Sequence, residues 1–315
     1  MHLQDLIFGP PEVADPKRGL VEKPRAKPRS FWYHVESIAF LAGVPTLIFG
    51  LVACTFAFLT VTVPALAWTL LACSLLLALF FLYVNYTNTS RRPFYMYLAI
   101  LTALAIVGGL VTGRWVYETH SLQYFSTSRR VPYSDVPPTG EADEYSDAAT
   151  LDFSSYAFVD TRRAAGRTGL SGHIYCVAPV MGVTSADHAS FWAAGIDCCE
   201  TLSDFYCGDV EDKAAKTGVA VAQVPLFWQM QTPLYAEFNR TVHQAAAAYR
   251  LTAPQDPVIV YWSKDVAETK AKFLKGALTS ILQALQGFSF VAIVLAIILH
   301  LGTRKASTPS WANFN

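Results

Sequence analysis

The sequence has long stretches without charge. Lys, Arg, Asp and Glu make up 15% of its 315 residues, yet none falls within residues 37–84, 94–113 or 276–302. About 20 consecutive apolar residues are enough for a helix to cross the hydrocarbon core of a bilayer. The missing charge therefore excludes an ordinary soluble fold for these segments and indicates a membrane protein. Nucleic-acid binding is not expected, because 24 basic residues are balanced by 24 acidic ones.

The first uncharged stretch is too long for one span. As a single helix, residues 37–84 would extend about 70 Å, against a hydrocarbon core of roughly 30 Å. β-branched residues weaken a helix near Thr60, and Pro64 is suited to a helix start. We therefore predict three spans within residues 37–116 and a fourth near the end of the chain: 37–59, 64–84, 94–113 and 276–302.

Basic residues predict the orientation of these spans. They are concentrated in the tail 1–36, in the second loop at Arg91 and Arg92, and in the tail 303–315 at Arg304 and Lys305. Short cytosolic loops carry such an excess, so both termini are predicted to be cytosolic and residues 117–275 extracytoplasmic. The first 30 residues lack the apolar region of a cleavable signal peptide. The first span is therefore expected to direct the protein to the plasma membrane or a secretory-pathway membrane.

Cysteine is scarce, with six in the chain. Cys54 and Cys73 lie in predicted spans, where they are expected to pack. The other four lie in the predicted extracytoplasmic loop, where an oxidising environment favours two disulfides: Cys176, Cys198, Cys199 and Cys207. Adjacent cysteines rarely bond to each other, because their side chains diverge in an extended chain. We predict that one of the adjacent pair bonds to Cys176 and the other to Cys207, in either order.

Other chemistry for these cysteines is less well supported. A zinc site would require Cys-x2-4-Cys spacing and a reducing compartment. A cysteine nucleophile would require a histidine, and no pattern connects His188 or His243 to a thiol. Asp209, Glu211 and Asp212 follow Cys207 without an EF-hand pattern, which favours a solvated loop over a calcium site. We expect no metal.

The large loop is predicted to contain a linker and a folded domain. Residues 117–150 are rich in Ser, Thr, Pro, Asp and Glu, which is typical of a loosely ordered linker. Residues 151–270 are predicted to form an α+β domain. Its strands are predicted at Tyr156–Val159, His173–Val180, Gly218–Val224 and Pro257–Trp262, with Phe191–Cys198 ambiguous between strand and helix.

One helix of this domain has a strong signal. Thr232 can cap it and Pro233 can occupy its first turn. Its apolar residues then share one face: Leu234, Phe238, Val242, Ala245 and Tyr249. Asn239 begins an Asn-Arg-Thr glycosylation sequon on the polar side, beside the solvent-facing His243, so the protein is predicted to be a glycoprotein. The sequons at Asn85 and Asn88 fall on the predicted cytosolic side and are expected to be unmodified.

Catalytic motifs are lacking. Phosphate-binding loops and metalloprotease motifs are absent, and Gly169-Leu170-Ser171-Gly172 is one residue short of a nucleophile elbow. We expect no catalytic residue and no cofactor.

The predicted spans contain no Asp, Glu, Lys or Arg, and Gln283 and Gln286 are their most polar candidates. These glutamines are expected to hydrogen-bond between helices, with a transport path as the alternative. Close helix packing is predicted at four glycines, within the bundle or between chains: Gly43, Gly50, Gly109 and Gly113.

The layout resembles that of a tetraspanin: four spans, a very short first loop and a large third loop with adjacent cysteines. The resemblance is limited to layout, because Cys198-Cys199-Glu200 replaces the Cys-Cys-Gly motif and Cys176 precedes the pair. The ectodomain is similar to uncharacterised four-pass membrane proteins of single-celled algae over most of residues 150–265. The similar segments are Tyr175–Pro179, Phe191–Cys199, Phe205–Gly208 and the later helix. This resemblance implies no particular activity.

The sequence thus predicts an α-helical four-span bundle with a disulfide-bonded α+β extracytoplasmic domain. The expected function is to organise other membrane proteins or to bind an extracytoplasmic ligand through that domain, without enzymatic activity. A channel or transport component and an ectoenzyme are the alternatives. The lipid bilayer is the one partner that composition itself indicates.

Overall fold

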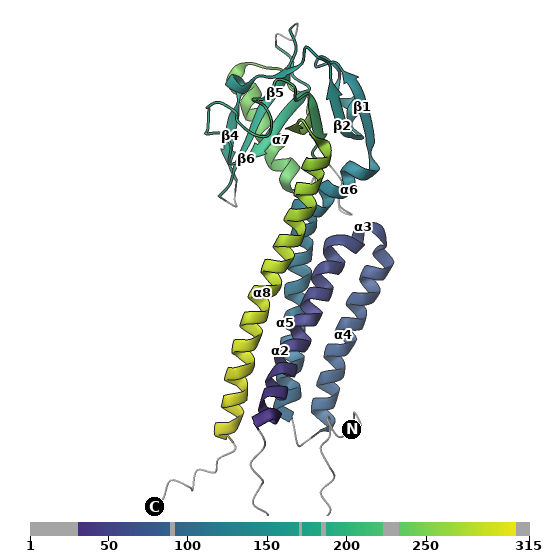
Figure 1. Cartoon of the computed structure of the whole chain (residues 1–315), viewed down its shortest axis with the longest axis vertical. Coiled ribbons are helices and arrows are strands. Elements are labelled where there is room, and N and C mark those ends of the chain that lie inside the picture. Colours follow the sequence, from purple (N-terminus) through teal and green to yellow (C-terminus); the bar gives the residue numbers. More distant parts are fainter. Residues whose placement is uncertain (1–30, 89–91, 170–171, 184–186, 223–232, 307–315) are drawn as a thin grey trace, which may run out of the picture. The chain divides into compact units, whose positions relative to one another are not determined.

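The computed structural model describes residues 31–88, 92–169, 172–183, 187–222 and 233–306 (Figure 1). The predictions for the tails 1–30 and 307–315, Arg91, Ser171 and Thr232 lie outside these residues. By their contacts the described residues form two units, which divide between Ser37 and Ile38; the helix packing and the sheet described below belong to the second. Four described helices are long and apolar enough to cross a membrane: Val35–Leu59, Pro64–Thr87, Pro93–Arg129 and Val266–Leu299.

The first two of these helices are separated by a short break. Helix α2 (Phe31–Cys54) continues through a π-helical turn, η1 (Thr55–Leu59), and the single turn α3 (Thr60–Thr62). Val63 leaves the helical conformation, and α4 (Pro64–Thr87) begins with Pro64 in its first turn. A proline is well placed there, because its missing N–H would have no helical partner at that position.

The third and fourth helices are longer than their uncharged segments. Helix α5 (Arg92–Val116) runs through the π-helical turn η2 (Tyr117–Ser121) into α6 (Leu122–Arg129), and α8 extends over Val266–Ala306. The predicted linker over residues 117–150 is therefore wrong. It contains helix up to Arg129, then β1 (Val131–Val136), the 3₁₀ turn η3 (Ala142–Tyr145) and the start of β2 (Ala148–Phe153).

The polar composition does not reveal this ordered structure, because the residues on the buried face of the segment are themselves polar. Gln123 is 1% exposed, and its Oε1 accepts a hydrogen bond from the backbone N–H of Ala222 at 3.1 Å. The Lys270 ammonium of α8 lies over the Tyr124 ring, 5.0 Å from its centroid. Such tertiary contacts order a segment whose local composition is typical of a loop.

The helices pack through apolar clusters. One cluster joins residues from α2, α4, α5 and α8, including Leu41, Phe81, Leu98 and Ala296. Another joins Ala57 of η1 and Val116 of α5 to Ala277 and Ile281 of α8. Apolar side chains on the outward faces remain exposed in the protein, as expected for helices surrounded by lipid.

The remainder of the chain forms an eight-stranded mixed sheet, in the order β1-β2-β7-β8-β6-β5-β3, with β4 also beside β5. Pairs β1–β2 and β6–β8 are parallel, and the other pairs are antiparallel. The other strands are β3 (Phe158–Val159), β4 (Ala165–Thr168), β5 (Ile174–Met181), β6 (Phe191–Ile196), β7 (Thr217–Ala220) and β8 (Val258–Ser263). The ambiguous segment from Phe191 is thus a strand. We call residues 131–263 the sheet domain.

One face of the sheet is covered by α7 (Pro233–Tyr249), as Figure 1 shows. Phe238, Val242 and Ala245 are fully buried there in a cluster with Trp192 and Ile259 of the sheet. The opposite face carries a second cluster, including Leu151, Phe153, Phe191 and Trp262. The two disulfides lie on this second face.

Candidate functional site

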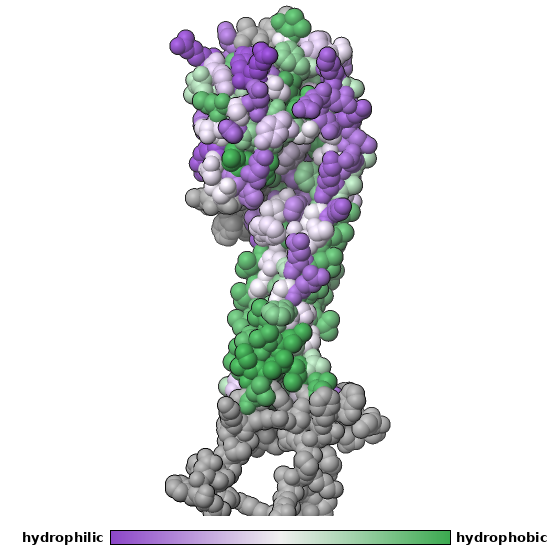
Figure 2. All heavy atoms as spheres, turned by 60° about the vertical axis from the view of Figure 1, so that its left-hand side comes forward, coloured by the Kyte–Doolittle hydropathy of each residue, from purple (hydrophilic) through white to green (hydrophobic). Residues whose placement is uncertain are grey.

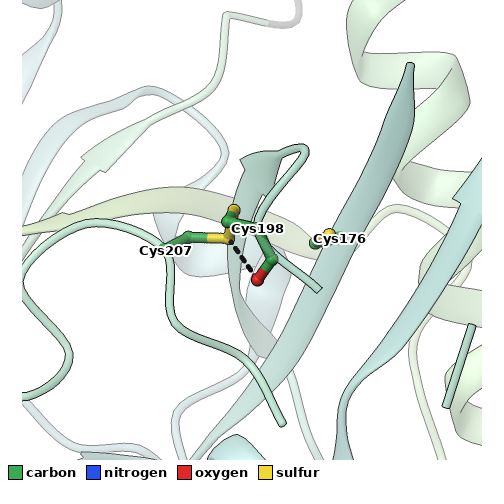
Figure 3. Close-up of side chains that lie close together, drawn as sticks. All are labelled: Cys176, Cys198 and Cys207. Atoms are coloured by element: carbon green, nitrogen blue, oxygen red, sulfur yellow. Dashed lines mark hydrogen bonds between the residues drawn. A yellow bond between two sulfur atoms is a disulfide. The ribbon is translucent and has the colours of Figure 1, made fainter. Parts of the chain in front are cut away.

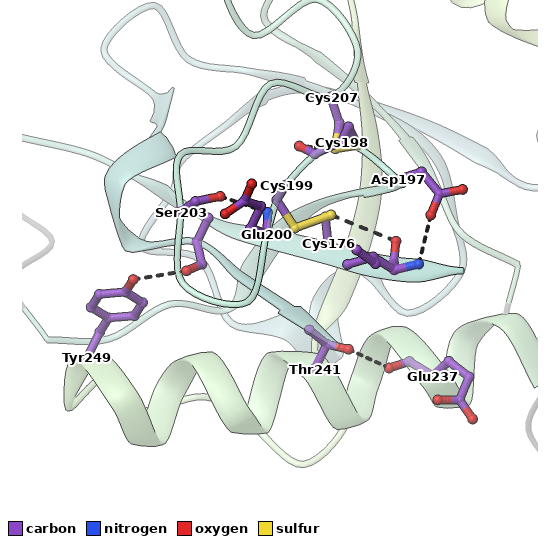
Figure 4. The surroundings of a disulfide bond; sticks show 12 residues. Cys176, Asp197, Cys198, Cys199, Glu200, Ser203, Cys207, Glu237, Thr241 and Tyr249 are labelled. Atoms are coloured by element: carbon purple, nitrogen blue, oxygen red, sulfur yellow. Dashed lines mark hydrogen bonds between the residues drawn. A yellow bond between two sulfur atoms is a disulfide. The ribbon is translucent and has the colours of Figure 1, made fainter. Parts of the chain in front are cut away.

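The best-defined cluster of reactive residue types in the sheet domain is its four cysteines (Figures 3 and 4). Cys176 on β5 bonds to Cys199, with their Cα atoms 5.8 Å apart. Cys198 bonds to Cys207, with a Cα separation of 5.2 Å. Both separations lie in the usual range for disulfides. The prediction of two disulfides is confirmed, and the order left open by the sequence is Cys199 with Cys176 and Cys198 with Cys207.

The sheet accommodates both disulfides because glycines flank Cys176. In the register of the sheet, Cys176 pairs with Gly166 on β4 and with Gly195 on β6. A Cβ at Gly166 would lie 2.7 Å from Cys199 Sγ, and one at Gly195 would lie 2.6 Å from Cys198 Sγ and would also meet Cys207. Only glycine leaves room for the sulfur atoms at these positions. We call this row of three residues the glycine–cysteine row.

Sequence reasoning missed the glycine–cysteine row. A glycine inside a strand often marks a place where another chain segment approaches closely. Gly195 lies in a segment rich in aromatic and small apolar residues, so that signal was present. Gly166 lies in a segment for which no strand was predicted. Recognising the row required the strand register, which the sequence alone does not provide.

The sulfur atoms of Cys176, Cys198 and Cys207 lie within 4.8 Å of one another. Cysteine binds metals, and attacks substrates, as the thiolate. All three sulfurs are committed to disulfides in this structure, so the cluster presents no thiolate. In this state its chemistry is that of a covalent cross-link, which ties the loop after β6 to the middle of the sheet.

A polar contact holds the turn that precedes the adjacent cysteines. Asp197 has a positive φ of 58°. Its carboxylate accepts a hydrogen bond from the backbone N–H of Ile174 at 2.8 Å and lies 2.6 Å from His173 Nδ1. The Ile174 N–H, followed by His173, lowers the pKa of Asp197. These contacts fix the direction in which the chain enters Cys198 and Cys199.

The candidate histidines lie elsewhere. His188 Nε2 is 3.0 Å from Ser190 Oγ, and His243 is exposed on α7, as its helical position predicted. Asp212 forms an ion pair with Lys264 at 2.9 Å, and the backbone N–H of Lys264 donates to Asp209 at 2.8 Å. Two of the three acidic residues after Cys207, Asp209 and Asp212, are thus engaged with Lys264.

The sheet domain also presents an apolar edge. β3 is the last strand in the order, and Phe158 on it pairs with Met181 of β5. Tyr156 is 47% exposed, Phe158 is 45% exposed and Val183 is 83% exposed. We call these three residues the β3-edge patch. The sequence predicted a strand here but gave no indication that its aromatic side chains would face solvent.

The predicted packing glycines are not equivalent. A Cβ at Gly109 would lie 2.8 Å from the carbonyl oxygen of Phe49, and one at Gly113 would lie 2.6 Å from that of Ala53. These two glycines therefore allow α5 to approach α2. A Cβ at Gly50 would make an ordinary contact with Leu285 at 3.4 Å, whereas one at Gly43 would meet nothing within 4 Å. Packing at Gly43 is not found in the part of the chain that the structure describes.

Within the described residues, neither Gln283 nor Gln286 makes a side-chain hydrogen bond to another helix, so the predicted bonds are not found inside the bundle. Both side chains are exposed on α8. The buried positions of α8 are instead small or apolar: Ala277, Ile281, Ala292 and Ala296. These positions fall on one side of the helix, and the two glutamines fall on the opposite side.

The glycosylation candidate Asn239 is half-buried on α7. Its Nδ2 donates to the carbonyl oxygen of Gln255 at 3.3 Å, and Thr241 of the same sequon is fully buried. In this fold the hydroxyl of Thr241 is inaccessible, so a glycan at Asn239 would have to be attached before the domain folds. Its modification stays a prediction.

Comparison with known protein families, curated proteins and solved structures finds no match to this chain. The resemblance to four-pass algal proteins therefore stays a prediction. The arguments about function that follow rest on the residues of this chain.

Proposed function

We propose that this protein is an integral membrane protein whose sheet domain lies outside the cytosol and binds partner proteins without enzymatic activity. Both termini are cytosolic, and the membrane is the plasma membrane or a membrane of the secretory pathway. The observation that carries the binding role is the β3-edge patch. Asn239 is glycosylated in this proposal.

The extracytoplasmic placement is supported by the disulfides together with the distribution of charge. Structural disulfides persist in oxidising compartments and are rare in the cytosol. The basic residues at Arg91 and Arg92, and at Arg304 and Lys305, lie at the ends of apolar segments opposite to the ends that lead into the sheet domain. Both observations favour the same orientation.

The β3-edge patch supports partner binding because its composition is that of an interface. Aromatic residues are enriched in the cores of protein interfaces, and large exposed apolar groups that gather on one surface mark interaction sites. Tyr156 and Phe158 lie on or beside an edge strand, where an extended segment of a partner can also add to the sheet. The proposed partner surface is therefore apolar and extended.

The test is a triple substitution in the full-length protein, Tyr156→Ser, Phe158→Ser and Val183→Ser. A matched control is Leu202→Ser with Tyr206→Ser, because those side chains are also exposed, at 61% and 58%. Proximity labelling from the sheet domain should lose a defined set of neighbours with the triple variant and keep it with the control. Unchanged neighbours, at equal surface amounts of properly disulfide-bonded protein, would refute the role of the patch.

A transport path along the glutamines has less support. Gln283 and Gln286 face away from the other helices of the described bundle, so they do not line a space between them. Their position calls for a different explanation.

A further inference from the structure

The outward face of α8 combines polar groups with an apolar setting. Gln283 and Gln286 are exposed, and so are Phe290 and Ile297, which follow at helical spacing on the same side. Only 17% of the most apolar stretch of α8 is buried inside the protein, the smallest share among the four candidate spanning helices. We call these four residues, with Gly287 beside them, the α8 stripe.

The α8 stripe lies at the depth of the membrane rather than at its edge. Ala284, Leu285 and Phe288 pack against Phe49, Ala53 and Ala105. Phe49 is near the middle of the uncharged segment of α2, and Ala105 is near the middle of that of α5. Gln286 lies between Leu285 and Phe288 in sequence, so its amide is at the level of these central residues.

An amide at this depth needs a partner. Burying one in an apolar environment without a hydrogen bond costs several kcal/mol, and lipid tails offer neither donor nor acceptor. Within the described residues, neither glutamine side chain makes a hydrogen bond to the rest of the protein. Figure 2 brings the side of α8 forward and shows a largely hydrophobic helical surface there, in contrast to the hydrophilic sheet domain.

We infer that the α8 stripe is the contact between two copies of this chain in the membrane. A glutamine amide carries both donors and acceptors, so it can pair with the identical group of a second copy. Two copies in the same membrane share one orientation, so a two-fold axis that relates them is perpendicular to the membrane. When this axis passes beside the α8 stripe, Gln286 lies opposite Gln286 of the second copy. A Cβ at Gly287 would meet nothing within 4 Å among the described residues, and the missing side chain leaves room for a second helix backbone to approach.

This inference rests on the membrane placement proposed above, but not on the β3-edge patch. The first measurement uses purified full-length protein in phosphatidylcholine vesicles, with the dimer fraction counted by single-molecule photobleaching at increasing protein-to-lipid ratios. Replacing both glutamines, Gln283→Leu with Gln286→Leu, should raise the dissociation constant by about tenfold. The pair Gln283→Asn and Gln286→Asn keeps the amides and should recover at least part of the association.

A lipid-facing control is Leu75→Ala with Leu79→Ala on α4, whose side chains are exposed at 48% and 59%. It should leave the dimer fraction unchanged. A monomer at every ratio, or equal association by wild type and the leucine variant, would overturn the inference. Release of the protein from membranes by alkaline carbonate would instead contradict the membrane placement, so the two failures are distinguishable.

Cysteine cross-linking locates the contact. In a background with Cys54 and Cys73 changed to alanine, Phe290→Cys on the stripe should form a disulfide-linked dimer under mild oxidation. Leu75→Cys on α4 is the matched control, because that side chain is also exposed, at 48%, but lies on another helix. Equal cross-linking at both positions would place the contact elsewhere and overturn the inference.

Discussion

At the scale of single residues, the two disulfides of the sheet domain need free volume beside Cys176 as well as the cysteines themselves. Two disulfides occupy one face of a sheet beside β5, where strands are about 4.8 Å apart. They fit because Cys176 has a glycine on each neighbouring strand. In the loop-entropy description, the bond that spans 23 residues stabilises the fold by about 3.4 kcal/mol and the one that spans 9 by about 2.6 kcal/mol.

The first prediction concerns Gly195. In Gly195→Ala, the added methyl group would lie 2.5 Å from Cys207 Cβ and 2.6 Å from Cys198 Sγ. Overpacking of this kind typically costs about 1–3 kcal/mol. We expect Tm to fall by several degrees, and Cys198 and Cys207 to become partly reactive to maleimide without reduction. Thermal unfolding of the full-length protein in detergent, with mass-spectrometric thiol mapping, measures both effects.

The control for this experiment is Gly43→Ala, whose added methyl group meets nothing within 4 Å. It should leave Tm and the thiol pattern unchanged. Wild-type thiols and an unchanged Tm in Gly195→Ala would show that the glycine–cysteine row is not needed for the disulfides.

At the scale of elements, the sequence specified those whose signal is local. Missing charge identified the four long apolar helices, and the spacing from Leu234 to Tyr249 identified α7. β5 and β8 were recognisable from their β-branched and aromatic residues. These features arise from burial along one segment, so one segment is enough to reveal them.

Elements stabilised by distant contacts were missed. Residues 117–150 were predicted to form a linker, although Gln123 bonds to Ala222 and Thr150 at the start of β2 pairs with Val219 of β7. The same limit applies to the disulfide partners, since composition cannot show which of two adjacent cysteines faces Cys176. Gln283 and Gln286 were recognised as polar, but which side of α8 is buried depends on its neighbours.

The second prediction belongs to the crossing of α2 and α5. Gly109→Ala would place a methyl group 2.8 Å from the carbonyl oxygen of Phe49 and 3.1 Å from Val52 Cβ. Backbone cannot move aside as a flexible side chain does, so the two helices must separate. We expect a loss of about 1–3 kcal/mol, measured as a lower Tm in detergent.

Gly287→Ala serves as the comparison in the same bundle, because its methyl group would meet nothing within 4 Å of the single chain. Under conditions that keep the protein monomeric, its Tm should match that of the wild type. If Gly109→Ala were equally harmless, the close approach of α2 and α5 would not hold in the folded protein.

At the scale of the whole molecule, topology connects the charge pattern to the disulfides. The two lines of evidence are independent, because one concerns the ends of apolar helices and the other concerns sulfur chemistry in the sheet domain. They agree only if the end of α4 near Tyr86 faces the cytosol and the sheet domain faces the opposite side.

The third prediction tests that topology with single cysteines, introduced where side chains are exposed in the folded protein. Glu144→Cys lies in the sheet domain, and Tyr86→Cys lies at the end of α4, where the native side chain is 79% exposed. In intact cells displaying the protein at their surface, a membrane-impermeant maleimide should label Glu144→Cys at once. It should label Tyr86→Cys only after permeabilisation.

The native cysteines should contribute no background labelling. Four of them are in disulfides, and Cys54 and Cys73 lie within apolar helices. The reverse pattern would place the four cysteines in the cytosol, where their disulfides would need another explanation, and would remove the extracytoplasmic role of the β3-edge patch.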